Sequence, residues 1–152
     1  MPDLVFRSAT SADLPFMVSL IAGDDVGVQM DDPATPHAAP YEAALAAIEA
    51  DPNQELFIAE ADGRPVGTFQ LTYIPGIARQ GMLRGLVEAV HVIPEARNRG
   101  YGRQMMAWAV DRCRDRGCGM VQLTSNKLRV DAHRFYRTLG FAQSHEGFKL
   151  FL

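Results

Sequence analysis

The sequence has little cysteine and no long apolar run, and both absences narrow what the protein can be. Its two cysteines, Cys113 and Cys118, come without a second Cys or His pair at metal-ligand spacing. Neither a disulfide framework nor a zinc site is therefore expected, and we expect no metal. No apolar stretch approaches the ~18 residues that a membrane-spanning helix needs. The first residues lack the basic and apolar regions of a secretory signal, so we expect a cytoplasmic protein without a membrane partner.

The composition is that of one globular domain. Of 152 residues, 47% are hydrophobic and 22% are charged, which argues against disorder and predicts a single domain over residues 1–152. Residues 1–90 carry 13 acidic and 4 basic side chains, or −9, whereas residues 91–152 carry 5 acidic and 11 basic, or +6. This split favours an anionic ligand on the C-terminal half, unless the charges only solvate two surfaces. The basic residues are not interleaved with exposed aromatics, so we expect no nucleic-acid partner.

Apolar spacing predicts a mixed α/β order of strands and helices. The expected strands are residues 4–7, 55–61, 64–74, 82–93, 120–124, 141–144 and 148–152. The expected helices are residues 9–22, 41–50, 102–116 and 131–139, the last one capped by Asp131. Asp62-Gly63 and Glu146-Gly147 are the expected hairpin turns. The strand at 120–124 follows a crossover helix and should lie parallel to the strand that ends at Ile93.

The strand that ends at Ile93 leads into a glycine turn, residues 97–102, with the sequence Arg-Asn-Arg-Gly-Tyr-Gly. A helical pattern starts at Arg103. The first backbone N–H groups of a helix lack internal partners and lie at its positive end, so this turn predicts an anion site. A dinucleotide fingerprint is excluded because Met105 occupies the position of the third glycine, and a P-loop is excluded because no Gly-Lys-Ser/Thr follows.

Two segments then resemble the GNAT superfamily of N-acetyltransferases, of the small-molecule type. Arg97, Gly100 and Gly102 match its R/Q-x-x-G-x-G/A signature, and residues 132–141 match its A-x-x-F-Y-x-x-x-G-F segment. The resemblance implies a mixed, centrally splayed sheet of six to seven strands flanked by about four helices. It also implies acetyl-CoA as co-substrate. The residues that it places against acetyl-CoA are Val90, His91, Val92, Arg97, Asn98, Arg99, Gly100, Tyr101, Gly102, Arg103, Asn126 and Tyr136.

The resemblance also implies the catalytic roles. Tyr136 matches the tyrosine that protonates the departing thiolate, although its place on an apolar helix stripe would also suit a core tyrosine. Glu88 is the expected base, on the same strand face as Val90 and Val92 if no bulge intervenes. A salt bridge from Glu88 to Arg84 is an equally good reading, and water alone would also serve. By the same alternation His91 points to the opposite face, where a structural role is favoured.

The acceptor is expected to be a small amine, attacked directly in a ternary complex because Cys113 lies in an apolar stripe. Residues 23–40 carry four aspartates and suggest a cationic amine. A phosphonate acceptor would want basic residues in the N-terminal loops, which offer mainly Arg79 and Arg84. A protein or peptide N-terminus and a non-catalytic acetyl-CoA sensor are the alternatives. An edge strand at residues 148–152 would allow a homodimer.

Overall fold

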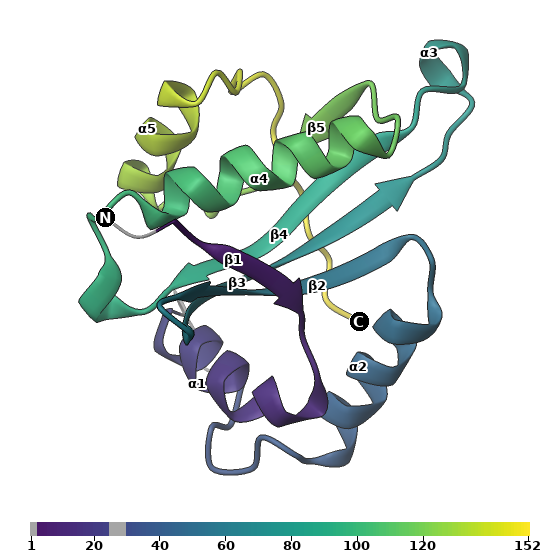
Figure 1. The fold of residues 1–152 in the computed structure, drawn as a ribbon. Coiled ribbons are helices and arrows are strands. Elements are labelled where there is room, and N and C mark those ends of the chain that lie inside the picture. The colour runs from purple at the N-terminus through teal and green to yellow at the C-terminus, as the bar shows by residue number, and fades with distance from the viewer. Residues whose placement is uncertain (1–2, 25–29) are drawn as a thin grey trace.

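The computed structural model describes residues 3–24 and 30–152. One mixed sheet runs through the molecule in the order β1-β2-β3-β4-β5 (Figure 1). The first four strands pair antiparallel, and β4 pairs with β5 in parallel. The expected mixed α/β class and the parallel last pair are therefore confirmed. The strands are β1 (Val5–Ser8), β2 (Gln54–Ala61), β3 (Arg64–Ile74), β4 (Arg84–Val92) and β5 (Met120–Gln122).

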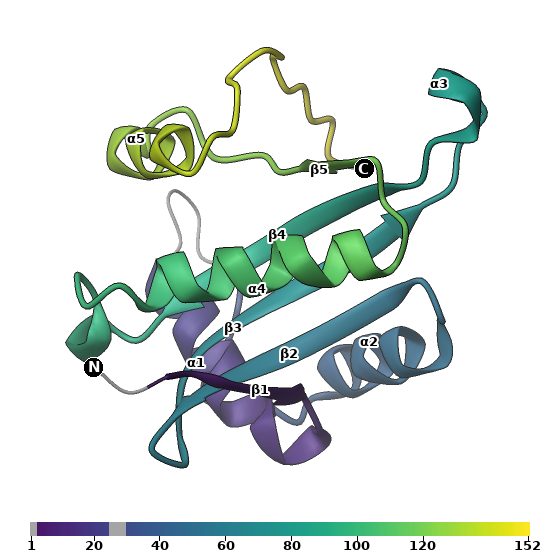
Figure 2. The same cartoon turned by 45° about the horizontal axis from the view of Figure 1, so that its top comes forward.

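Helices cover both faces of the sheet. The two helices that precede β2 lie on one face, while the helix between β4 and β5 lies along the other with the last helix beside its N-terminal end (Figure 2). Among the described residues no helix is long and apolar enough to cross a membrane. The helical segments are η1 (Ser11–Asp13), α1 (Leu14–Asp24), α2 (Ala39–Ala50), α3 (Ala78–Gly81), η2 (Pro94–Ala96), α4 (Tyr101–Asp115) and α5 (Val130–Thr138).

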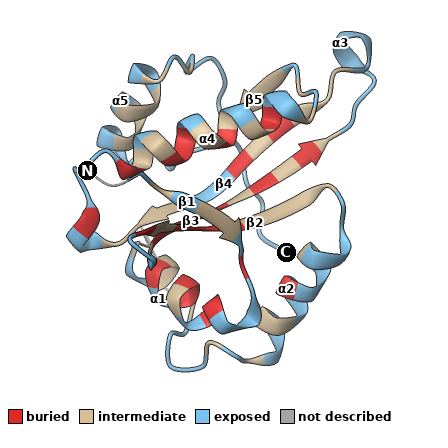
Figure 3. Ribbon diagram, viewed as in Figure 1, coloured by how far each residue is buried: buried red, intermediate tan, exposed pale blue. Residues whose placement is uncertain are grey.

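The larger core lies between the sheet and α4. Figure 3 shows buried residues on the central strands and on the sides of the helices that turn toward the sheet. A Cβ atom on Gly85 would lie 2.5 Å from the Sγ atom of Cys113, so only glycine allows α4 to approach β4 this closely. Burial raises the pKa of the Cys113 thiol to about 12, which makes it inert, as expected.

One of the two expected hairpin turns is present, at Asp62-Gly63, whereas the turn expected at Glu146-Gly147 does not form. Asp62 and Gly63 have φ angles of 51° and 74°, the left-handed pair that a tight hairpin turn requires. The expected helix cap at Asp131 is wrong, because α5 begins at Val130 and Arg129 occupies the capping position. The Asp131 carboxylate lies in the first helical turn instead, where it still faces the positive end of the helix.

The expected closing strands are wrong. Residues 141–144 and 148–152 form neither helix nor strand, and β5 ends at Gln122 rather than at 124. Within residues 3–24 and 30–152 the sheet therefore has five strands instead of six or seven. Alternating apolar and polar residues give these segments the side-chain pattern of a strand. A segment becomes a strand only when a neighbouring backbone forms hydrogen bonds with it, and these segments have no such neighbour among the described residues.

Glu55 ties α4 to the sheet. Its carboxylate on β2 accepts hydrogen bonds from the Tyr73 hydroxyl at 2.6 Å and from Arg112 Nε at 3.0 Å. Arg116 stacks over the Tyr73 ring with its Cζ atom 4.0 Å from the centroid. Burial alone would raise the pKa of Glu55, but the bonds from Arg112 and Tyr73 outweigh it and hold this pKa below 4.5.

We expect Glu55→Gln to lower the free energy of unfolding at pH 7 by about 2 kcal/mol, because the variant loses charge-assisted hydrogen bonds. A carboxyl group whose pKa is lower in the folded state stabilises the fold at pH values above its unfolded-state pKa. This stabilisation is lost as the pH falls through the folded-state pKa. The gap between wild type and variant should therefore shrink below about pH 4.5. Urea unfolding between pH 3 and 7 measures it. The exposed Glu49→Gln is the control, and a gap that stays constant with pH would contradict the assignment.

Candidate active site

β4 and β5 part after three residues. The parallel ladder joins Arg84–Leu86 to Met120–Gln122 and stops there. Beyond it the strands diverge around a cavity of about 240 Å³. The splayed centre that the sequence implies is therefore present. The cavity walls come from β4, from the segment after β5 and from α5, and consist of Val87, Glu88, Ala89, Val90, His91, Leu123, Thr124, Ser125, Asn126, Arg129 and Tyr136.

A β-bulge shapes the β4 wall of this cavity. Ala89 has a φ angle of 51°, and the ladder with β3 shifts register at this point, so that Gln70 faces Glu88 while Thr68 faces His91. Thr68 and Gln70 are two residues apart and share a face, so their partners share it too. Glu88 and His91 therefore lie on the same side of the sheet, the side of Ile58 and α1.

This arrangement corrects the expected faces. Simple alternation placed Glu88 with Val90 and Val92, and His91 opposite. In the structure Val90 and Val92 pack against the core under α4, with Val87, because the extra residue at the bulge reverses the alternation. Val92 also lies one residue beyond the cavity wall, which ends at His91 on this strand.

Glu88 is available for chemistry. Its side chain is exposed and makes no ion pair with a described residue. The alternative reading, a salt bridge to Arg84, is not observed, because Arg84 donates a hydrogen bond to Gln122 Oε1 at 3.0 Å. The carboxylate therefore lines the cavity without a cationic partner among the described residues.

Tyr136 closes the opposite wall from α5. Its ring packs against those of Phe135 and Phe141, with centroid separations of 5.3 and 6.1 Å. Burial raises the pKa of Tyr136, and the charge of Arg129 partly opposes this rise. A tyrosine with a raised pKa remains protonated at neutral pH, as a proton donor must.

Asn126 lines the cavity and also makes hydrogen bonds within the turn that precedes α5. Its Oδ1 atom accepts a hydrogen bond from the Leu128 N–H at 2.9 Å, and its carbonyl oxygen accepts one from Arg129 N–H at 2.9 Å. Asn126 therefore helps to form the turn that precedes α5. Its side-chain NH2 group remains the part that could meet a ligand.

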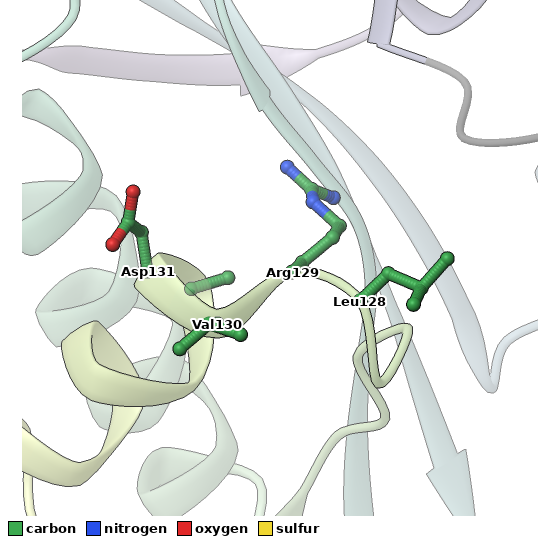
Figure 4. Close-up of a pocket in the computed structure, with 5 residues that line it drawn as sticks. Leu128, Arg129, Val130 and Asp131 are labelled. Carbon is green, nitrogen blue, oxygen red and sulfur yellow. The ribbon is translucent and has the colours of Figure 1, made fainter.

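Arg129 is the cavity residue that the sequence reasoning missed. It also borders a second hollow of about 330 Å³ at the start of α5, where its side chain extends from the chain just before the helix (Figure 4). Its guanidinium makes no hydrogen bond or ion pair with a described residue. The signal was its spacing, because Arg129 precedes Tyr136 by seven positions, about two helical turns, and stands just before the helix that carries Tyr136.

The glycine turn offers a row of unused donors. Across the described chain, no backbone N–H of residues 98–103 donates a hydrogen bond to another residue. Asn98 and Gly100 adopt φ angles of 61° and 80°, which hold the turn open before α4 begins at Tyr101. A Cβ atom on Gly102 would make only an ordinary 3.5 Å contact with Phe135, so the fold itself does not demand glycine there.

Two of the three arginines of this turn have partners. Arg97 Nε donates to the Val92 carbonyl at 3.1 Å, and Arg103 donates to Thr138 Oγ1 at 3.4 Å. Arg99 is exposed and makes no ion pair within the described ranges. Donors at the start of a helix, together with a free guanidinium, suit a phosphate-bearing ligand.

Two aspartates of the acidic segment, residues 23–40, accept hydrogen bonds from nearby residues of the chain. The Asp32 carboxylate accepts hydrogen bonds from the Ala34 N–H at 2.9 Å and from Thr35 Oγ1 at 3.1 Å. Asp31 accepts one from the Tyr41 hydroxyl at 2.8 Å. Asp25 lies outside the described residues. Nowhere in residues 3–24 or 30–152 do three or more His, Cys, Asp or Glu side chains cluster to hold a metal.

Comparison with known proteins gives this geometry a context. Residues 26–141 match the model of the Acetyltransferase (GNAT) family. The aminoalkylphosphonate N-acetyltransferase of Salmonella typhimurium is 30% identical over 145 residues, 95% of this chain and 89% of that protein. The glucosamine 6-phosphate N-acetyltransferase of Trypanosoma brucei brucei is 33% identical over 92 residues, 60% of each chain. A Bacillus halodurans C-125 crystal structure, described as a transcriptional regulator, superposes with a TM-score of 0.93 at 39% identity, covering 98% of this chain and 99% of that one.

The left-handed backbone of Ala89 in the bulge should lower the stability of the fold. Ala89 is exposed and left-handed, so Ala89→Gly should raise the free energy of unfolding by about 0.5–1 kcal/mol by relieving the Cβ strain. Ala47→Gly, at an exposed position within α2, should lower it by a similar amount. Chemical denaturation of both variants measures the difference. Equal losses in the two variants would mean that Ala89 sits in ordinary strand geometry.

Proposed function

The chain belongs to the GNAT acetyltransferase family, and from that premise we propose that it moves the acetyl group of acetyl-CoA to the primary amine of a small acceptor. The transfer is direct, within a ternary complex, and one acetyltransferase domain spans residues 1–152. The observation that carries the proposal is the cavity between β4 and β5. It holds an exposed carboxylate, Glu88, and a half-buried phenol, Tyr136, on opposite walls.

The reaction needs three proton movements. The attacking amine must be neutral, so Glu88 first takes a proton from the ammonium group, directly or through water. The amine nitrogen then attacks the thioester carbonyl carbon, a C–N bond forms, the C–S bond breaks, and the departing thiolate takes a proton from the Tyr136 hydroxyl. The second proton that the nitrogen loses as the amide forms restores the tyrosine, directly or through water. Burial keeps the Tyr136 hydroxyl protonated beforehand, which suits it to protonating the thiolate.

The donor site draws on backbone groups. The unpaired N–H groups of residues 98–103 and the Arg99 side chain fit the pyrophosphate of acetyl-CoA. The β4 edge from Val87 to His91 faces the cavity rather than a neighbouring strand, and suits the pantetheine arm. A backbone N–H at the bulge would stabilise the negative charge that develops on the carbonyl oxygen.

Arg129 points to an acceptor that carries an anionic group beside its amine. A guanidinium without a described ionic partner shares the cavity with the carboxylate of Glu88. An acceptor with an ammonium and a phosphonate, phosphate or carboxylate group would complement both. Two relatives are named for such substrates, an aminoalkylphosphonate and glucosamine 6-phosphate. The cation for such an acceptor then comes from the start of α5 rather than from Arg79 or Arg84 in the N-terminal loops.

Tyr136→Phe should lower kcat by about 10²- to 10⁴-fold and leave the KM for acetyl-CoA largely unchanged, because the ring is kept and only the acid is lost. The pKa of Tyr136 in the wild type is raised above its ordinary value of 10.0. Ionisation of this tyrosine should therefore cause no loss of kcat below about pH 10.0. Release of coenzyme A against an amine panel measures both. Equal kcat values would remove Tyr136 from the mechanism. Wild type that binds acetyl-CoA but turns over no amine would favour a sensor.

Arg129→Met should raise the KM for 2-aminoethylphosphonate about tenfold or more, because one charge-assisted contact is lost. The KM for propylamine, which lacks the anionic group, should not change. Arg129→Lys keeps the charge and should recover part of the loss. A rise in the KM for acetyl-CoA alone would instead assign Arg129 to the donor side and overturn the acceptor assignment.

A further inference from the structure

Three polar side chains form a hydrogen-bonded group on the side of the sheet that faces α1. Gln54 lies on β2, while Gln70 and Thr72 lie on β3. The Gln54 Oε1 atom accepts hydrogen bonds from Gln70 Nε2 at 2.9 Å and from Thr72 Oγ1 at 2.8 Å. All three side chains are partly buried. Polar side chains that satisfy one another in a partly buried place are held in one geometry, so the Gln70 amide has a defined position.

Gln70 is the member of this group that lies beside the proposed base. Its partner on β4 is Glu88, whereas Thr72 has Leu86 as its partner. Residues directly opposite each other on one face of an antiparallel pair have Cβ atoms about 5 Å apart. The Gln70 amide and the exposed Glu88 carboxylate are therefore neighbours on the same face of the sheet.

One polar atom of the Gln70 side chain remains available to a ligand. Nε2 donates to Gln54, whereas Oε1 accepts no hydrogen bond from the residues that the structure describes. An amide oxygen accepts a hydrogen bond from an N–H group without carrying a charge. It can therefore bind an amino group next to Glu88 without the like-charge repulsion that a second carboxylate would introduce.

We propose that Gln70 Oε1 accepts a hydrogen bond from the amino group of the acceptor and that Gln54 is the positioning residue that holds this amide. The role rests on the proposed function, because it needs an amine at Glu88. Glu88 takes one proton from the ammonium group, and Gln70 binds an N–H that the neutral amine keeps. With that N–H held, the nitrogen lone pair stays directed at the thioester carbonyl carbon.

The pair of groups also selects the class of acceptor. A primary amine still carries two hydrogens after Glu88 has taken a proton, so it can satisfy Gln70 while it attacks. An alcohol has a single O–H hydrogen and cannot serve both side chains. The site therefore favours transfer to nitrogen over transfer to oxygen.

Gln70→Met keeps the length of the side chain and removes the amide. We expect it to lower kcat/KM about 10- to 100-fold for both 2-aminoethylphosphonate and propylamine, because both present the same amino group and lose the same hydrogen bond. The KM for acetyl-CoA should not change. Release of coenzyme A measures all three constants.

Thr72→Val is the matched control. It also removes one hydrogen bond to Gln54 Oε1, but residue 72 lies opposite Leu86 and not opposite Glu88. Urea unfolding should show similar losses of stability in Thr72→Val and Gln70→Met, while Thr72→Val keeps the wild-type kinetic constants. If Gln70 only supported the fold, the two variants would share their kinetics as well as their stability.

Gln54→Met tests the positioning role and remains informative if Gln70→Met does not fold. It leaves the Gln70 amide in place but removes the group that holds it, so kcat/KM for both amines should fall by less than in Gln70→Met. The double variant should be no worse than Gln70→Met alone, because Gln54 acts only through Gln70. Losses that add in the double variant would contradict this role.

The outcomes separate this site from the proposed function. A wild type that acetylates amines, with amine constants that survive in both Gln70→Met and Gln54→Met, would overturn the role of Gln70 and leave acetyl transfer standing. A raised KM for acetyl-CoA alone would also overturn it. A wild type that turns over no amine would contradict the proposed function and the role of Gln70 together.

Discussion

Beyond Leu86, the edge of β4 that faces β5 has no strand to pair with, because the parallel ladder ends at Gln122. Backbone groups that leave a ladder must find other partners, in water or in a ligand. The cavity between the strands opens where this loss begins. The bulge at Ala89 lies on the same stretch and turns Glu88 and His91 to one side of the sheet. The end of pairing with β5 leaves space beside β4, and the bulge against β3 sets the direction of the side chains around that space.

The position of α4 depends on the part of β4 that stays paired. Gly85 lies within the ladder and allows the helix to approach until Cys113 touches the strand. At its other side α4 is held by the contact between Arg112 and Glu55. A helix fixed in this way also fixes the glycine turn before it, where the N–H groups of residues 98–103 donate to no described residue. Two contacts of α4, one with β4 and one with β2, therefore hold this turn in position.

Local features of the fold were readable from the sequence, and features that depend on pairing between distant segments were not. The β3 strand, the Asp62-Gly63 turn and the glycine turn before α4 follow from residue types within a few positions. The bulge at Ala89 was not readable, because its neighbours alternate as in a regular strand and the irregularity appears only against β3. The same limit explains residues 148–152, which have the pattern of a strand but no strand beside them. Arg129 was not readable either, because it lies in neither matched motif and only the fold brings it to the cavity beside Tyr136.

The excess positive charge of the C-terminal half illustrates why charge counts alone do not locate a site. Arg112 and Arg116 are bound to Glu55, while Arg114 pairs with Asp111. What remains for a ligand are cations such as Arg99 and Arg129, which pair with no described carboxylate and lie at the glycine turn and at the cavity.

Two ionisable side chains of the cavity, Tyr136 and Glu88, lie in different environments. Tyr136 belongs to a packed helix, where burial favours its neutral form, whereas the Glu88 side chain is exposed on β4. Because Arg129 stands between α5 and the strand wall, its charge lowers the cost of ionising Tyr136. An anionic group bound to Arg129 would cancel that effect and raise the pKa of Tyr136, which keeps the hydroxyl protonated but makes it a weaker acid.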